Sequence, residues 1–113
     1  MSLTEQESKG FWPIYRDYRA DMDKIGDGIV ELVLEYDDAY PNMPEARAQQ
    51  MLAQYTTLEK HRADVRALYL RKLRRVLPAS KTLRFAQLET RLDLAVNVRL
   101  ASAIPLVPVS KAK

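Results

Sequence analysis

The first part of the chain carries an almost unbroken apolar stripe with the spacing of a coiled coil. Its members lie alternately four and three residues apart: Phe11, Tyr15, Tyr18, Met22, Ile25, Ile29, Leu32 and Tyr36. A mean spacing of about 3.5 residues puts these side chains on one side of an α-helix, which must then lie along another helix to keep the stripe out of water. The stripe therefore predicts helix packing, and it carries no indication of catalysis.

Two breaks in the apolar periodicity divide the chain into three predicted helices. The breaks fall at Tyr40-Pro41-Asn42 and at Leu77-Pro78, where proline disfavours continued helix. The expected segments are helices over residues 4–37, 43–76 and 79–103 and an extended tail over 104–113. The first two helices each span about 50 Å at a rise of 1.5 Å per residue, and matched lengths joined by a short loop favour an antiparallel hairpin. We expect one all-α domain without strands.

Local signals in the first helix indicate how it begins and where it is disturbed. Thr4 and Glu7 have the spacing of a capping box. Pro13 removes one backbone hydrogen bond inside the segment, so we expect either a kink there or a short separate helix before it. Gly26 and Gly28 in mid-helix indicate either close backbone approach or a second bend.

The second and third helices carry less regular apolar stripes. Asn42 is predicted to cap the second helix, with Pro44 in its first turn. The stripe of the second helix consists of Met51, Tyr55, Leu58, Val65, Tyr69 and Val76. The stripe of the third helix consists of Phe85, Leu88, Leu92, Ala95 and Val96. The tail from Ile104 to Val109 combines two prolines with aliphatic side chains, so we expect it to dock in a groove of this subunit or a neighbour.

Charge is divided unevenly along the chain. Residues 1–40 hold four basic and ten acidic side chains, whereas residues 41–113 hold fourteen basic and five acidic ones. Between Lys60 and Arg91 ten Lys or Arg stand against Asp64 and Glu89 alone, a local charge of +8. Two interpretations stay open: this stretch binds an acidic partner, or the acidic first helix neutralises it within the fold.

Few residues are candidates for chemistry. His61 is the sole histidine and cysteine is absent, which excludes sites with two imidazoles, thiolate nucleophiles and sulfur ligands. Asp23 and Asp27 belong to a weak calcium-loop pattern, but Leu32 occupies the position of its bidentate glutamate. All three glycines fall within the helical pattern, so no phosphate-binding loop is predicted. We expect a protein that is not an enzyme, with no catalytic, cofactor-binding or metal-binding residues.

Partner binding is the remaining class of function, and four residues are candidates for it. Trp12 lies off the main stripe and either packs one end of the bundle or lines a client-binding surface. Arg71, Arg75 and Arg84 are the candidates within the basic stretch. Long helices in a chain of 113 residues leave much surface wet, so a homodimer is expected. No run of about 18 apolar residues occurs, so no membrane insertion is expected.

Three stretches of the chain resemble a known family. Residues 11–18, 77–89 and 104–107 are similar to a family of exported helical proteins of proteobacteria, itself distantly similar to the Spy/CpxP group of periplasmic stress proteins with LTxxQ motifs. Leu3-Thr4 followed by Glu7, and Leu77-Pro78 followed by Lys81, stand where the two motifs would fall, without the final glutamine.

The resemblance implies a helical hairpin that forms a curved dimer in the periplasm, its export leader removed. It also implies binding of unfolded clients or of a sensor protein without ATP, and no zinc, because the histidines and cysteines of metal-responsive members are missing. The leading hypothesis is therefore a periplasmic chaperone or an envelope-stress accessory or sensor protein. The alternatives are a cytoplasmic regulator that binds nucleic acid through residues 60–91, and a purely structural assembly module.

Overall fold

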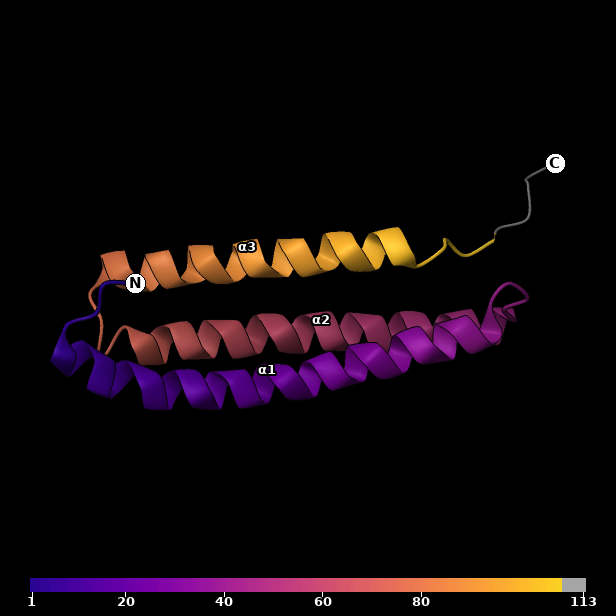
Figure 1. Ribbon diagram of the computed structural model, residues 1–113. Coiled ribbons are helices and arrows are strands. Elements are labelled where there is room, and N and C mark those ends of the chain that lie inside the picture. Colours follow the sequence, from indigo (N-terminus) through magenta and orange to yellow (C-terminus); the bar gives the residue numbers. More distant parts are fainter. Residues whose placement is uncertain (109–113) are drawn as a thin grey trace.

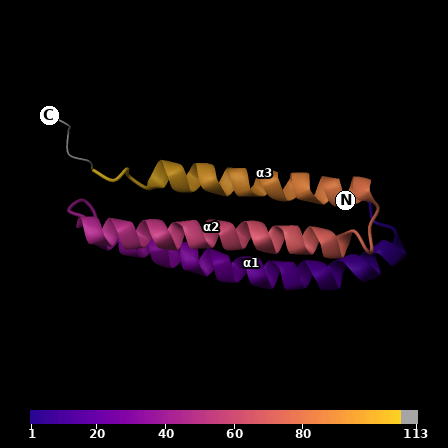
Figure 2. The same cartoon turned by 180° about the vertical axis from the view of Figure 1, so that it is seen from behind.

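The computed structural model describes residues 1–108, and within them the fold is all-helical without strands (Figure 1). The three helices are α1 (Glu5–Ala39), α2 (Glu45–Leu73) and α3 (Ala79–Ala103). Figures 1 and 2 show α1 and α2 side by side as an antiparallel pair, with α3 running along them. The molecule is elongated, with extents of 62 × 22 × 20 Å. The predicted all-α fold built on a long-helix hairpin is confirmed.

Helix α1 begins at the predicted capping box and runs without interruption to Ala39. The Thr4 hydroxyl oxygen accepts a hydrogen bond from the Glu7 amide at 3.1 Å, and the Thr4 amide donates to Glu7 Oε1 at 2.9 Å. Pro13 lies inside this single helix, so the alternative of a short separate helix before it is wrong. A helix this long can accept one missing hydrogen bond because its stability comes from packing along its whole length.

Helix α2 is shorter than predicted at both ends. Its N-cap is Pro44, which provides no side-chain hydrogen bond, so the prediction of Asn42 as cap is wrong. The helix ends at Leu73, and the chain turns through residues 74–77, where Arg74 donates from its guanidinium to the Leu77 carbonyl oxygen at 2.9 Å. This turn directs Leu77 inward, where it is buried.

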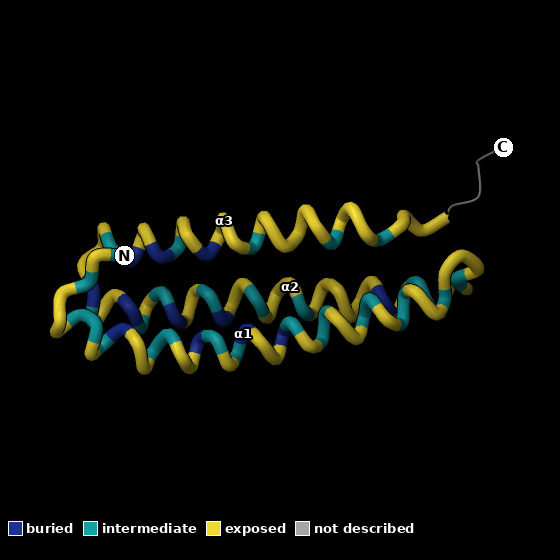
Figure 3. Tube along the Cα trace, viewed as in Figure 1, coloured by how far each residue is buried: buried dark blue, intermediate teal, exposed yellow. Residues whose placement is uncertain are grey.

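The core occupies one end of the molecule (Figure 3). We call residues 1–25 and 62–95 the closed half and residues 26–61 and 96–108 the open half. Of the twelve buried residues, only Met51 lies in the open half. The main core cluster consists of Phe11, Tyr18, Met22, Ile25, Val65, Tyr69, Leu73, Leu77 and Phe85. The same three helices are therefore well covered at one end and poorly covered at the other.

The predicted stripes follow this division. In the α1 stripe four residues are buried, whereas Tyr15, Ile29, Leu32 and Tyr36 stay partly exposed. In the α2 stripe Met51, Val65 and Tyr69 are buried, Leu58 and Val76 are partly exposed, and Tyr55 is exposed. The buried Leu73 and Leu77 belong to neither predicted stripe.

The stripe predicted for the third helix is wrong except at Phe85. Its other members are exposed: Leu88, Leu92, Ala95 and Val96. The face of α3 that is buried carries Thr82, Phe85 and Glu89, two of them polar, because α3 meets α1 and α2 through hydrogen bonds as well as apolar contact. Apolar surface on α3 is consequently left uncovered.

The first part of the tail stays close to the bundle. The Tyr36 hydroxyl donates a hydrogen bond to the Pro105 carbonyl oxygen, and Ile104 is partly buried, whereas Leu106 is almost fully exposed. The expectation that the tail docks holds for this contact, and residues 109–113 lie outside the described part.

Candidate partner-binding grooves

An aromatic cluster attaches α3 to the hairpin in the closed half. The ring of Phe85 lies 5.9 Å from that of Phe11, 6.0 Å from that of Tyr15 and 5.6 Å from that of Tyr18, in edge-on geometry. Such pairs stabilise beyond simple burial by about 0.5–1.5 kcal/mol. Phe85 is thus the apolar anchor of α3.

A polar network lies next to this anchor and joins all three helices. The Tyr18 hydroxyl donates to Glu89 Oε2 at 3.2 Å and accepts from Arg66 Nε at 3.4 Å. Arg66 also pairs with Asp93, and Arg19 lies 3.9 Å from Glu89. Burial raises the pKa of the Tyr18 phenol. A buried network of this kind fixes the relative position of helices more than it adds stability.

From the Arg66–Asp93 pair toward the open half the helices enclose two connected apolar grooves, the first of which also reaches Arg19 and Met22 of the closed half. The α1–α3 groove, of about 630 Å³, is lined by Val30, Val33 and Leu34 of α1 and by Val96 and Leu100 of α3. A second groove of about 650 Å³, the tail groove, shares Val33 and Leu100. It continues along α2 and the start of the tail, where its lining includes Met51, Leu52, Tyr55, Ile104 and Val107.

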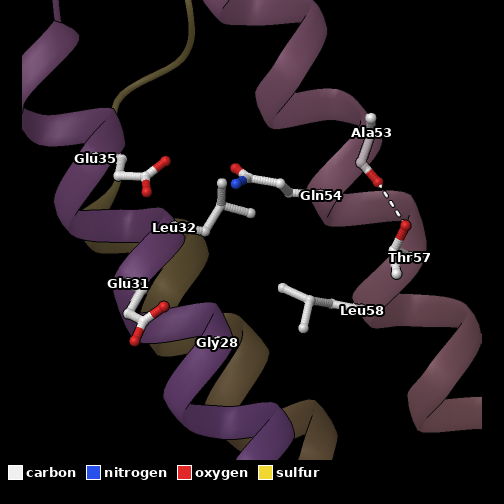
Figure 4. Close-up of a pocket in the computed structure, with 8 residues that line it drawn as sticks. All are labelled: Gly28, Glu31, Leu32, Glu35, Ala53, Gln54, Thr57 and Leu58. Carbon is white, nitrogen blue, oxygen red and sulfur yellow. Dashed lines mark hydrogen bonds between the residues drawn. The ribbon is translucent and has the colours of Figure 1, made fainter.

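A smaller hollow lies between α1 and α2 in the same half (Figure 4). Leu32 and Leu58 reach into it, and Glu31 and Glu35 stand at its α1 side. A Cβ atom on Gly28 would lie 2.8 Å from Leu58 Cδ2, so the glycine faces a side chain of α2 and not its backbone.

Trp12 lines a different hollow, in the closed half. This N-terminal pocket of about 720 Å³ is formed by the start of the chain, α1 and α3, and includes Met1, Phe11, Trp12 and Leu92. Trp12 is half exposed, and its ring packs edge-on against Phe11 and Tyr15. Trp12 therefore packs against the bundle on one side and lines a pocket on the other, and its role in client binding stays a prediction.

The three candidate arginines lie on both sides of the turn between α2 and α3, with Arg71 at the end of α2, Arg75 in the turn and Arg84 in the second turn of α3. Arg71, Arg75 and Arg84 are exposed and form no ion pair with a carboxylate of residues 1–108. None of them lines the N-terminal pocket together with Trp12. The candidates thus form two separate groups.

The two positions at which the LTxxQ-like segments end are brought into contact. The Lys81 ammonium donates to Glu7 Oε1 at 2.5 Å, and this hydrogen bond lowers the pKa of the Glu7 carboxyl. The pair links the first turn of α1 to the first turn of α3, and so holds the closed end together.

Charge separates along the long axis. The closed half holds 13 basic and 8 acidic side chains, a net charge of +5, and the open half holds 3 basic and 7 acidic ones, a net charge of −4. Residues 27–38 of α1 contribute five carboxylates and no Lys or Arg. Only Glu35 among these carboxylates is in an ion pair within residues 1–108, with Arg47 at 3.5 Å. The apolar grooves therefore lie in an acidic part of the surface.

Residues 1–108 contain no candidate metal centre. In the described residues no group of three or more His, Cys, Asp or Glu is placed to hold a metal ion, and His61 is exposed. No helix there is both long and apolar enough to cross a bilayer. No family model, curated protein or solved structure matches the chain.

Sequence reasoning missed the open grooves as a site. One signal was available: residues 96–108 contain a single charged side chain, Arg99. A helix that is apolar on all sides is normally covered by other protein.

Proposed function

We propose that this chain is a helical binding protein that holds segments of partner proteins in the apolar grooves of its open half. In this proposal it acts without ATP, as a periplasmic chaperone or as an envelope-stress accessory or sensor protein. The observation that carries the proposal is the exposure of apolar side chains around the grooves. Val30, Leu34 and Val96 are 57%, 60% and 55% exposed, although water contact with such side chains is unfavourable.

The arrangement suits reversible capture of extended or helical segments. The grooves are open along their length, and their lining is mostly aliphatic, which favours burial of apolar side chains without demanding one sequence. The closed half supplies a rigid base through the Phe85 cluster and the Tyr18–Glu89 network. The resemblance to exported stress proteins supports the same proposal.

The test is suppression of aggregation of a reduced model client by the folded protein at stoichiometric ratios. We expect light scattering to fall as the ratio rises, and a double variant with Leu34→Gln and Val96→Gln to lose most of this activity. The matched control carries Leu83→Gln and Leu94→Gln, which are equally exposed but line none of the four pockets described. Absence of suppression at every ratio, with the helix content intact, contradicts the proposal.

A second candidate function has one observation in its favour. Four exposed arginines lie in or near the α2–α3 turn without a carboxylate partner in residues 1–108: Arg71, Arg74, Arg75 and Arg84. Such a surface fits the phosphates of nucleic acid, as in the regulator considered above. Binding to duplex DNA that weakens by about a decade per decade of salt for each neutralised phosphate would favour this function. Binding that is absent or insensitive to salt would exclude it.

A further inference from the structure

We propose that the α1–α3 groove binds an amphipathic helix that carries basic residues beside its apolar face. This inference rests on the proposed function, and it names the class of segment that the groove selects. Three observations carry it: the two apolar ridges along the groove, a glycine with free space above it, and the acidic charge of the α1 side.

The shape of the α1–α3 groove is suited to helix packing. Val30 and Leu34 stand one turn apart on α1, and Val96 and Leu100 stand one turn apart on α3. Side chains at this i, i+4 spacing form ridges, and a third helix packs its own ridge into the space between two of them. Beneath them Val33 and Ile29 are partly buried and form an apolar floor.

Gly26 marks the place where a partner approaches most closely. A helical glycine destabilises a helix by about 1 kcal/mol relative to alanine. The other two glycines of α1 face close neighbours within the chain, since a Cβ on Gly10 would meet Val76 of the turn after α2 and one on Gly28 would meet the Leu58 side chain, each at 2.8 Å. A Cβ on Gly26 would meet nothing within 4 Å, and Gly26 lines the α1–α3 groove. The missing side chain gives room for a backbone that belongs to a partner.

Charge selects the partner. The two cations that line the groove are already paired, Arg19 with Asp23 at 3.3 Å and Arg62 with Glu59 at 3.4 Å. Asp27 lines the groove and is in no ion pair within residues 1–108. Helical spacing places Asp37 on the same side of α1, one turn beyond Val33. A helix with Lys or Arg beside its apolar face complements these carboxylates, and an acidic one is repelled.

The experiment compares two labelled amphipathic peptides with identical leucine positions, one with lysines and one with glutamates on the polar face. We expect fluorescence anisotropy to show affinity for the lysine peptide at least about tenfold higher, and this preference to shrink with added salt. In Asp27→Lys with Asp37→Lys the preference disappears. Equal affinity of the native protein for both peptides overturns the proposal.

Substitution of Gly26 provides a second test, because it should weaken peptide binding without lowering stability. A glycine needed only for the fold would show the opposite result. Gly26→Leu fills the groove and is expected to weaken binding of the lysine peptide by about tenfold or more, with no loss of thermal stability because alanine-like helix propensity replaces that of glycine. Ala20→Leu, on an exposed part of α1 outside the pockets described, is the matched control and leaves binding unchanged. Unchanged binding in Gly26→Leu overturns the proposal.

Two further outcomes separate this inference from its alternatives. If the native protein sediments as a dimer that Gly26→Leu dissociates, the groove is occupied by a second copy and the proposal is wrong. If client aggregation is suppressed but neither peptide binds, the general function stands and this inference falls. If the lysine peptide binds in the groove without any suppression, the inference stands and the chaperone function falls.

Discussion

The closed and open halves consist of the same three helices, yet they differ in what covers their apolar side chains. On α1 the stripe continues at the same spacing from Phe11 to Tyr36, but it is well buried only as far as Ile25. In the closed half α3 adds Phe85 and Glu89 to the contact, whereas in the open half its side chains border grooves. The comparison shows that an apolar stripe predicts that a helix packs against another surface. It does not predict whether that surface belongs to the same chain or to a partner.

The polar network marks the boundary between the halves. Arg66 and Asp93 form its last link, and the next α3 residue toward the bundle is Asn97, which lines both grooves. The ion pair holds α3 in register at this point, and no comparable link follows before the hydrogen bond from Tyr36 to Pro105. Up to the network, α3 buries Phe85 and Glu89 against the hairpin beside the N-terminal pocket, whereas after it no residue of α3 is buried.

The largest expected difference between the halves is the cost of removing a core leucine. Leu73→Ala, at a residue 1% exposed, should destabilise the protein by about 2–5 kcal/mol, because the cavity adds to the lost burial. Leu52→Ala in the open half, at a residue 65% exposed, should change stability by less than about 0.5 kcal/mol. Urea unfolding followed by circular dichroism measures both, and equal costs would show that the halves are equally covered.

The next difference is the loss of stability when a buried carboxylate or a more exposed one is removed. Glu89→Ala should cost about 1–3 kcal/mol, because Glu89 is buried and its loss leaves the Tyr18 hydroxyl without an acceptor. Glu59→Ala removes an exposed ion pair with Arg62 and should cost at most about 1 kcal/mol. Glu89→Gln keeps an oxygen that can accept the hydrogen bond from Tyr18, so its loss of stability should lie between those of Glu89→Ala and Glu59→Ala. A cost for Glu89→Ala no greater than that for Glu59→Ala would contradict the buried network.

Glycine substitutions sharpen the comparison at the scale of about 1 kcal/mol. Gly26→Ala should raise the free energy of unfolding by up to about 1 kcal/mol, since the new methyl group meets nothing. Gly10→Ala in the closed half should lower it, because the methyl group would lie 2.8 Å from both Cβ and Cγ1 of Val76. Thermal unfolding distinguishes the two, and a gain at both positions would show that the ends of α1 and α2 approach less closely.

The sequence predicts the helices and their hairpin well because periodicity and proline breaks are local signals. The face of α3 could not be predicted in this way. Leu88 and Leu92 look like core residues and Glu89 like a surface residue, yet Glu89 is buried because Tyr18 and Arg19 come from another helix to meet it. The candidate grooves could not be predicted from the stripe either, because Val96 lies seven residues after Glu89 on the same side of α3 and yet is exposed, where α1 leaves a groove.

The smallest expected effect is a titration in the closed half. The Tyr69 hydroxyl donates to Asp21 Oδ2 at 2.6 Å, and this hydrogen bond, together with burial, raises the pKa of Tyr69 from 10.0 to about 12. The folded protein therefore keeps this proton where the unfolded chain loses it, so the stability that it contributes is complete below pH 10 and is lost as the pH rises through about 12. The pKa of Tyr18 is also raised, so tyrosinate absorbance should show a late titration to which more than one phenol contributes. Tyr69→Phe should reduce the amplitude of this late titration by one phenol, and Asp21→Asn should move one phenol back toward 10.0. If the late amplitude is the same in Tyr69→Phe as in the native protein, Tyr69 does not titrate late and the contact between α1 and α2 at this point is looser than the structure has it.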